Sequence, residues 1–243
     1  MRYWPHFLLA PPARSRVVCE PMRASILLKA WMGLSGLFLV LFVLVHMAGN
    51  LQLFLPADIA RPSFNAYSQV LTSSLVIKVA GWLTYAAIVG HALISAVLAW
   101  RHRSPRPPYA LDRPATSSPW YARSMGWLGV VTLAFLVLHM QAFWYRYHWG
   151  EIGIDARGNK DLYTVVVTAF CEPWIVLVYV TSMLALGFHL QHGIAAALRS
   201  LGVFSGRITK LAPRVAGWVA WVVAGTFASM PIYVYVSFGG QAP

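Results

Sequence analysis

The sequence is poor in charge, and above all in negative charge. Only 11% of its 243 residues are charged, and seven Asp and Glu stand against 19 Lys and Arg. A typical soluble domain carries about 25% charged residues, so the composition excludes an ordinary water-soluble enzyme and a disordered chain. The two cysteines form no CxxC or CxxCH pattern. The sequence therefore lacks iron–sulfur spacing and covalent cofactor attachment.

Five long runs contain no charged residue at all, at 30–57, 79–100, 124–145, 173–198 and 215–243. Each is long enough for the roughly 20 apolar residues that cross a bilayer as a helix. None alternates in polarity as a membrane β-strand would. The sequence predicts an all-α integral membrane bundle of five transmembrane helices. We expect them at about 28–54, 76–100, 123–147, 171–199 and 213–238, in one domain covering 25–243.

The basic residues are divided unequally between the two ends of these predicted helices. Only five of the 19 lie on the second side, namely Arg61, Lys78, Arg146, Arg157 and Lys160. The positive-inside rule then predicts a cytoplasmic N-terminus and an external C-terminus. The net charge of +12 does not indicate nucleic-acid binding, because it lies between membrane spans rather than on one soluble face.

The segments outside the spans carry no predicted chemistry. Residues 1–24 are rich in Pro and Arg, and their apolar patch at 7–10 is too short for a signal peptide. We interpret them as a cytoplasmic tail, or as sequence upstream of a true start at Met22. Residues 101–123 form a Pro-rich cytoplasmic loop. Residues 55–77 form an outer loop with a short interfacial helix around 64–71.

Five of the eight histidines lie inside predicted spans: His46, His91, His139, His189 and His192. An ionisable side chain inside a bilayer is costly, and it indicates a functional site that faces the bundle interior. By helix rise, His46 and His139 lie about 25 Å from the cytoplasmic edge, and His91 and His189 about 15 Å from it. The histidines therefore form two predicted pairs at two heights, roughly 10 Å apart.

Two imidazoles that face each other at one depth can hold a haem iron from both sides. The sequence predicts two haems without covalent attachment, with His46, His139, His91 and His189 as axial metal ligands. Full bis-imidazole ligation suits electron transfer rather than oxygen chemistry. His192 is the alternative to His189, because three residues on a helix lie about 60° and 4.5 Å apart. The competing interpretation of each membrane histidine is an interhelical hydrogen bond.

Several motifs together resemble the single-chain cytochrome b membrane anchor of succinate dehydrogenases and fumarate reductases. They are Gly36-Leu37-Phe38-Leu39, His46-Met47-Ala48-Gly49-Asn50-Leu51, Phe64-Asn65-Ala66-Tyr67, Gly90-His91-Ala92, Leu138-His139, Phe188-His189-Leu190-Gln191-His192-Gly193 and Leu201-Gly202. The resemblance covers about residues 25–238 and implies two b haems. His91 and His189 would hold the haem nearer the iron–sulfur subunit, and His46 and His139 the outer one. In some relatives the fourth-span ligand matches His192 instead.

The resemblance further implies a quinone-reactive subunit of an enzyme complex in a bacterial-type cytoplasmic membrane. A flavoprotein subunit and an iron–sulfur subunit would dock on the cytoplasmic face, and succinate chemistry would occur there, outside this chain. Anchors of this kind often serve menaquinone, which we therefore favour over ubiquinone. The complex could form a higher oligomer. The basic loops could attract anionic lipid or help to dock the iron–sulfur partner.

A quinone site needs hydrogen-bond donors for the quinone carbonyls. On the cytoplasmic side the candidates are Lys29, Trp31, Ser35 and Arg101. On the outer side they are Asn50, Gln52, Asn65, Tyr67 and Glu172. Interface anchoring and helix capping explain most of these residues equally well, so the sequence does not choose among them.

Three alternatives remain open from the sequence. One is the cytochrome b subunit of another membrane oxidoreductase, of the hydrogenase or formate dehydrogenase type. Another is a haem-free transporter, although the charge-free runs argue against the polar midplane groups that a transporter needs. The third is a structural anchor without a cofactor.

Overall fold

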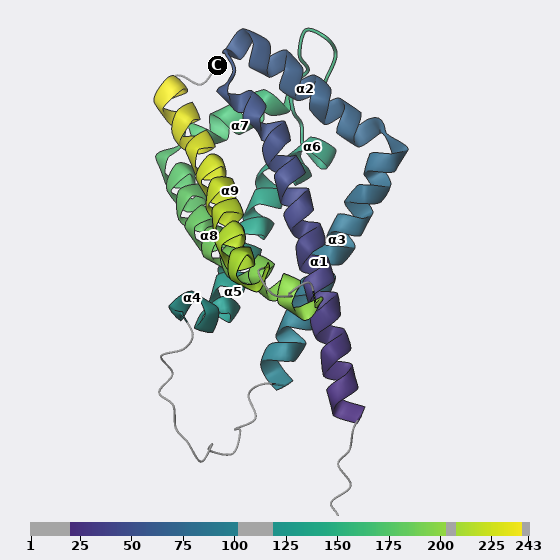
Figure 1. Ribbon diagram of the computed structural model, residues 1–243. Coiled ribbons are helices and arrows are strands. Elements are labelled where there is room, and N and C mark those ends of the chain that lie inside the picture. Colours follow the sequence, from purple (N-terminus) through teal and green to yellow (C-terminus); the bar gives the residue numbers. More distant parts are fainter. Residues whose placement is uncertain (1–19, 102–118, 203–207, 240–243) are drawn as a thin grey trace, which may run out of the picture.

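The computed structural model describes residues 20–101, 119–202 and 208–239 (Figure 1). Within these ranges the chain is helical, and its only β feature is an isolated bridge between Ile154 and Lys160. Most of the tail expected over 1–24 and of the loop expected over 101–123 lies outside the described residues. The all-α fold class is confirmed for the part of the chain that the structure describes.

Five helical segments are long and apolar enough to cross a membrane: Ile26–Phe54, Leu75–Arg101, Met125–Trp149, Pro173–Ser200 and Leu211–Phe238. The first comprises most of α1 (Glu20–Asn50) and the short η1 (Leu51–Phe54). The second is α3 (Leu75–Arg101). The third joins α5 (Met125–His139), the π-helical η3 (Met140–Tyr145) and α6 (Arg146–Trp149). The last two are α8 (Pro173–Ser200) and most of α9 (Ile208–Phe238). The prediction of five spans is confirmed.

Helix α8 packs against three other spanning helices, α1, α5 and α9. Helix α1 lies between α3 and α8, and α9 packs mainly on α8. A third of the apolar window is buried in α8 and in α9, but only 6% in the other three spans. Few residues of the spans that contain α1, α3 and α5 are fully buried inside the bundle, so these helices have apolar surface available for lipid.

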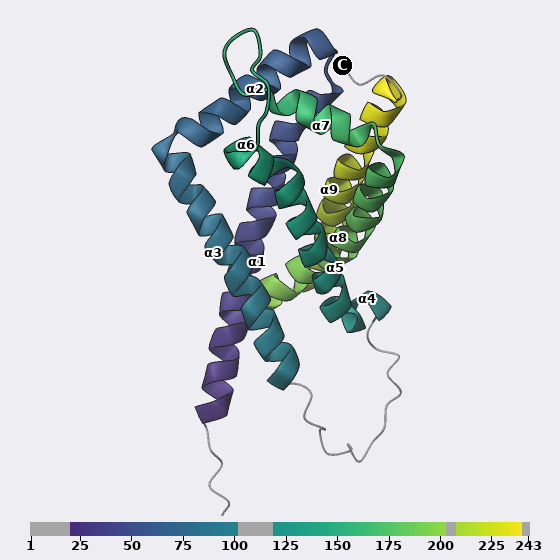
Figure 2. The ribbon, with the colours of Figure 1, turned by 180° about the vertical axis from the view of Figure 1, so that it is seen from behind.

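Two further helices lie across one end of the bundle, α2 (Ala57–Ser73) and α7 (Leu162–Phe170) (Figures 1 and 2). We call this the capped end. Helix α2 is longer than the short helix expected around 64–71, and α7 was not predicted. Ala60, Phe64 and Ser68 recur at the helical spacing on the buried face of α2. Burial of that face explains why α2 extends over the whole segment.

The packing of α2 on α1 depends on a glycine. The Tyr67 ring lies against Gly49, where an added Cβ would come within 2.6 Å of ring atoms. A buried cluster continues below it with Leu53, Phe64 and Tyr163. The cap is therefore a packed layer rather than a pair of loose connections.

The opposite end of the bundle carries the basic residues, and we call it the basic end. It is formed by the start of α1, the end of α3, the short α4 (Trp120–Arg123), the end of α8 and the start of α9 (Figure 2). Its basic residues include Lys29, Arg101, Arg123, Arg199 and Arg214.

Candidate functional site

His91 on α3 and His189 on α8 face each other inside the bundle. Their ring centroids lie 6.4 Å apart, with 70° between the ring planes. A glycine of a neighbouring helix lies beside each ring. A Cβ at Gly36 would stand 3.3 Å from the His91 ring, and one at Gly129 would stand 3.7 Å from the His189 ring. Four helices therefore meet around this inner pair, and glycine keeps space beside both imidazoles.

His46 on α1 and His139 on α5 form a second, outer pair. Their centroids are 5.7 Å apart and their planes are nearly perpendicular, at 89°. Aromatic rings enclose the pair: Phe42 and Phe227 lie 5.6 and 5.8 Å from His46, and Phe143 lies 5.3 Å from His139. The outer pair thus occupies an apolar, aromatic environment.

The backbone leaves α-helical geometry directly after one of these histidines. His139 is the last residue of α5, and the π-helical η3 begins at Met140. Single π-turns inside membrane or soluble helices occur frequently at functional sites. Phe143, which lies within this π-helical segment, packs edge-on against the His139 ring.

The two pairs lie at two levels of the bundle. On each of three helices, the same number of residues separates the residue at the inner level from the residue at the outer level. Helix α1 contributes Gly36 to the inner level and His46 to the outer, and α5 contributes Gly129 and His139. Helix α8 contributes His189 to the inner level, whereas its outer-level residue is Tyr179, which contacts His139. Each interval corresponds to about 15 Å of helix rise, somewhat more than the sequence estimate.

Hydrogen bonds orient the His91 ring. The Ser35 hydroxyl donates to the Met32 carbonyl at 3.2 Å and lies 3.1 Å from His91 Nδ1. A hydroxyl has a single hydrogen to donate, so when that hydrogen goes to Met32 the Ser35 oxygen accepts the Nδ1–H of His91. That arrangement leaves the lone pair of His91 on Nε2, and the free nitrogen of a neutral imidazole is the one that binds a metal.

The other three paired histidines differ in their polar contacts. Tyr179 Oη lies 3.3 Å from His139 Nδ1, and Asn50 Nδ2 donates to the His46 carbonyl at 2.8 Å. His189 Nδ1 is buried without a hydrogen-bond partner among the described residues. No hydrogen bond joins the two rings of either pair in the described structure. His91 and His139 are each hydrogen-bonded to a residue of another helix, Ser35 of α1 and Tyr179 of α8. Interhelical hydrogen bonds therefore describe these two rings singly, but they do not account for the meeting of the four rings in pairs.

His192 belongs to different surroundings from those of His189. Its ring lies 6.4 Å from Tyr121, whereas His91 faces His189. Because three residues on a helix turn the side-chain direction by about 60°, only one of the two histidines points at His91. The sequence left this choice open, and the geometry favours His189.

The quinone candidates do not come together at one place. Ser35 contacts His91, while Lys29, Trp31 and Arg101 are exposed on α1 and α3. At the capped end the candidates also serve other contacts. Tyr67 packs on Gly49, Asn50 binds the His46 carbonyl, Gln52 donates to the Gly49 carbonyl, Asn65 is fully buried, and Glu172 precedes α8.

Asn65 belongs to a polar network that joins α2 to α7. Its Nδ2 donates to Asp161 Oδ1 at 2.9 Å, and its Oδ1 accepts from the Tyr163 backbone N–H at 2.9 Å. Asp161 caps α7 by accepting from Thr164 N–H and from its hydroxyl, and Arg61 Nε donates to Asp161 at 3.0 Å. Asn65 therefore has a structural role.

The network also changes the acidity of its charged groups. Burial raises the pKa of the Asp161 carboxyl, but hydrogen bonds from Arg61, Asn65 and Thr164 outweigh burial, so the pKa lies below its ordinary value. The hydrogen bond between Arg61 and Asp161 also raises the pKa of the Arg61 guanidinium. Both groups remain charged near neutral pH.

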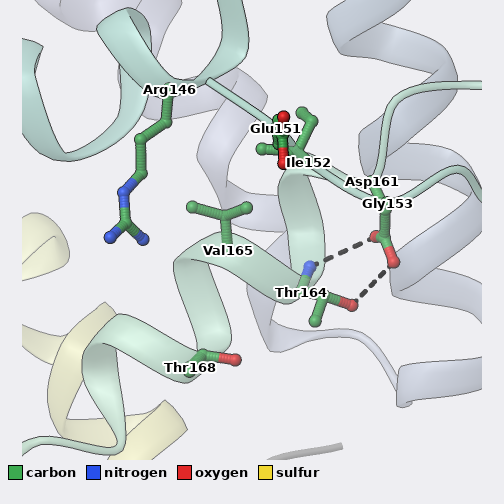
Figure 3. Close-up of a pocket in the computed structure, with 8 residues that line it drawn as sticks. All are labelled: Arg146, Glu151, Ile152, Gly153, Asp161, Thr164, Val165 and Thr168. Atoms are coloured by element: carbon green, nitrogen blue, oxygen red, sulfur yellow. Dashed lines mark hydrogen bonds between the residues drawn. The ribbon is translucent and has the colours of Figure 1, made fainter.

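A pocket of about 240 Å³ opens beside this network at the capped end (Figure 3). Arg146, Glu151 and Thr168 are among its lining residues. In Figure 3, Asp161 is joined to Thr164 by two hydrogen bonds, while Arg146 makes none with the residues drawn. None of the paired histidines lines this pocket, so it is separate from the candidate site.

The donor set limits what the histidine pairs can hold. The described residues contain no group of three or more His, Cys, Asp or Glu side chains that could hold a metal ion. Each pair offers two imidazoles, so a metal held there needs its other ligands from a non-protein group. A porphyrin supplies those ligands, and the unpartnered Nδ1 of His189 and the glycines beside the inner rings are compatible with such a group.

Comparison with known proteins identifies no relative: no family model, curated protein or solved structure matches this chain.

Proposed function

We propose that this chain is the membrane anchor subunit of a succinate:quinone oxidoreductase. It binds two b haems and quinone, and it passes electrons between an iron–sulfur partner and the membrane quinone pool. One observation carries the proposal. Four different helices each contribute one histidine, and the four side chains meet as two pairs at two levels of the bundle.

The spacing within each pair supports ligation of one iron between the rings. Two imidazoles that bind a metal from opposite sides have centres roughly 6 Å apart, because each metal–nitrogen bond is roughly 2 Å long. The observed separations are 5.7 and 6.4 Å. The aromatic surroundings of the outer pair would also exclude water from an apolar macrocycle.

The residues around the pairs have defined tasks in this proposal. His46 and His139 hold the outer haem, and His91 and His189 the inner one. Haem bound in this way supplies reversible one-electron transfer, since two imidazoles leave no open coordination position. Ser35, which lies at hydrogen-bond distance from His91 Nδ1, would hold His91 in the tautomer that leaves Nε2 free to bind the iron.

The charge distribution supports the proposed orientation. Basic residues favour the cytoplasmic side of a bacterial-type inner membrane, so the basic end would face the cytoplasm. The iron–sulfur and flavoprotein subunits would dock there, and succinate would be oxidised on those partners. Quinone, with menaquinone favoured, would exchange electrons within the membrane.

A pyridine haemochrome assay on the purified complex tests the proposal directly. The expected value is two b haems per chain. His91→Ala and His139→Ala should each retain one haem, because each removes one ligand of one pair. His192→Ala is the matched control on α8 and should retain two.

The outcomes separate the alternatives. A wild-type haem content near zero would overturn the proposal in favour of a transporter or a structural anchor. Two haems with a co-purifying hydrogenase or formate dehydrogenase would assign the chain to another oxidoreductase. Loss of haem in His192→Ala, with retention in a His189→Ala variant, would overturn the ligand assignment.

A further inference from the structure

A groove of about 220 Å³ lies at the basic end, between α4, α8 and α9. Its polar lining is Tyr121, Gln191, His192 and Arg199, and Pro119 and Pro213 contribute to its rim. The candidate functional site uses none of these side chains. The groove is therefore a second concave feature, with its own chemistry.

Most of the polar groups that line the groove can donate hydrogen bonds. Gln191 Oε1 accepts from the Trp221 indole N–H at 3.1 Å, which leaves the Gln191 amide N–H₂ to donate. Arg199 adds a permanent positive charge, and no acidic residue is among the lining residues that the structure describes. A ligand that accepts hydrogen bonds and carries negative charge matches these groups.

None of the paired histidines lines the groove. Its lining residues on α8 point away from the direction of His189 by about 60° at His192, about 120° at Ala195 and about 160° at Gln191. The groove therefore lies on another side of α8 from the inner histidine pair.

A cluster of aromatic rings adjoins the groove on its side toward the membrane centre, through the lining residues Tyr121 and Gln191. The Phe188 ring lies 4.7 Å from Trp120, 6.1 Å from Tyr121 and 4.9 Å from Trp221. Phe188 precedes His192 by about one helical turn, or about 6 Å. Donors at the basic end and rings one turn deeper match a ligand with an anionic head and an apolar body, at the level where aromatic side chains meet lipid headgroups.

We propose that this groove binds the phosphate of an anionic phospholipid, with Arg199 and the Gln191 amide as its main contacts. Basic pockets between membrane helices on the cytoplasmic side suit such headgroups. The aromatic side favours a lipid over free phosphate, because only the lipid brings acyl chains to cover it.

The test uses the purified full-length chain after delipidation, or its complex. Phosphatidylglycerol should raise the unfolding temperature by several degrees, whereas phosphatidylcholine and inorganic phosphate should not. Native mass spectrometry should show retained phosphatidylglycerol. Arg199→Gln should weaken its apparent affinity at least tenfold, and Arg101→Gln, which removes a charge from the same end outside the groove, should leave it unchanged.

A second variant tests the proposal independently, in case Arg199→Gln fails to fold. Gln191→Glu keeps the acceptor for Trp221 but replaces the amide donor with a negative charge, and it should also weaken phosphatidylglycerol binding. The proposal is overturned by equal stabilisation from phosphatidylcholine, by an equal effect of inorganic phosphate, or by unchanged binding in both variants. Displacement of the lipid by a short-chain naphthoquinone would reassign the groove to quinone.

Discussion

Replacement of Asp161 by Ala should loosen the capped end of the bundle. The carboxylate accepts hydrogen bonds from Arg61, Asn65 and Thr164, and it is only 4% exposed. The Ala variant removes the N-cap of α7 and the main link between α2 and α7. The prediction concerns stability, because no paired histidine contacts this network.

The expected loss of unfolding free energy is about 2–4 kcal/mol. Loss of an N-cap costs about 1 kcal/mol. The fully buried Asn65 amide would lose its best acceptor, which costs about 1–3 kcal/mol. Its weaker contact with Asp155, at 3.3 Å, remains in the variant and offsets part of this cost. Arg61 is 47% exposed and can return to water, so its contribution is small.

Reversible unfolding in mixed micelles, followed by tryptophan fluorescence, measures this loss. Asp58→Ala is the matched control, since Asp58 is an exposed acid in the first turn of α2, and its effect should stay within about 0.5 kcal/mol. A loss below about 1 kcal/mol for Asp161→Ala would refute the reasoning, because the buried amide would then have found another partner.

The Asp161 carboxylate should also make the free energy of unfolding depend on pH. The pKa of Asp161 is lower in the folded protein than its ordinary value, because hydrogen bonds from Arg61, Asn65 and Thr164 outweigh the opposing effect of burial. The stabilisation is therefore fully present above the unfolded pKa, about 3.9, and is lost as the pH falls through the folded value. The stability difference between wild type and Asp161→Ala should be constant from pH 5 to 8 and shrink near pH 3. An unchanged difference at pH 3 would contradict this sign.

Two predictions concern the inner histidine pair. Ser35→Ala should lower the affinity of that site for haem by roughly tenfold or more, because removal of a residue that hydrogen-bonds to a metal-binding histidine has effects of that size. Ser35→Thr should restore it, and haem titration with redox potentiometry reports the change. An Ala variant with unaltered affinity and potential would exclude a positioning role acting through His91. Gly129→Leu should reduce haem content toward one, because the added side chain enters the space beside His189. Gly126→Leu, where no atom lies within 4 Å of an added Cβ, should retain two haems, and equal loss in both variants would argue against a specific effect.

The sequence predicted the membrane spans well but missed most of the cap. Charge-free runs reveal membrane helices because the bilayer excludes charge over a fixed length. Helix α7 has only nine residues, and its position depends on contacts with Asn65 and Arg61 from α2. Those residues lie far from Asp161 along the chain, so no local sequence pattern predicts these contacts.

For the candidate site, the sequence by itself determined which histidines lie in the spans and that they fall at two levels, although it placed the levels too close together. Helix rise converts residue number into depth, and this needs no knowledge of packing. The direction in which each side chain points was decided only by the tertiary structure, because the rotation of a helix about its axis is set by its neighbours. That rotation places His189, and not His192, opposite His91. It also turns Gln191, His192 and Arg199 into a separate groove, which a one-dimensional pattern could not distinguish from the histidine site.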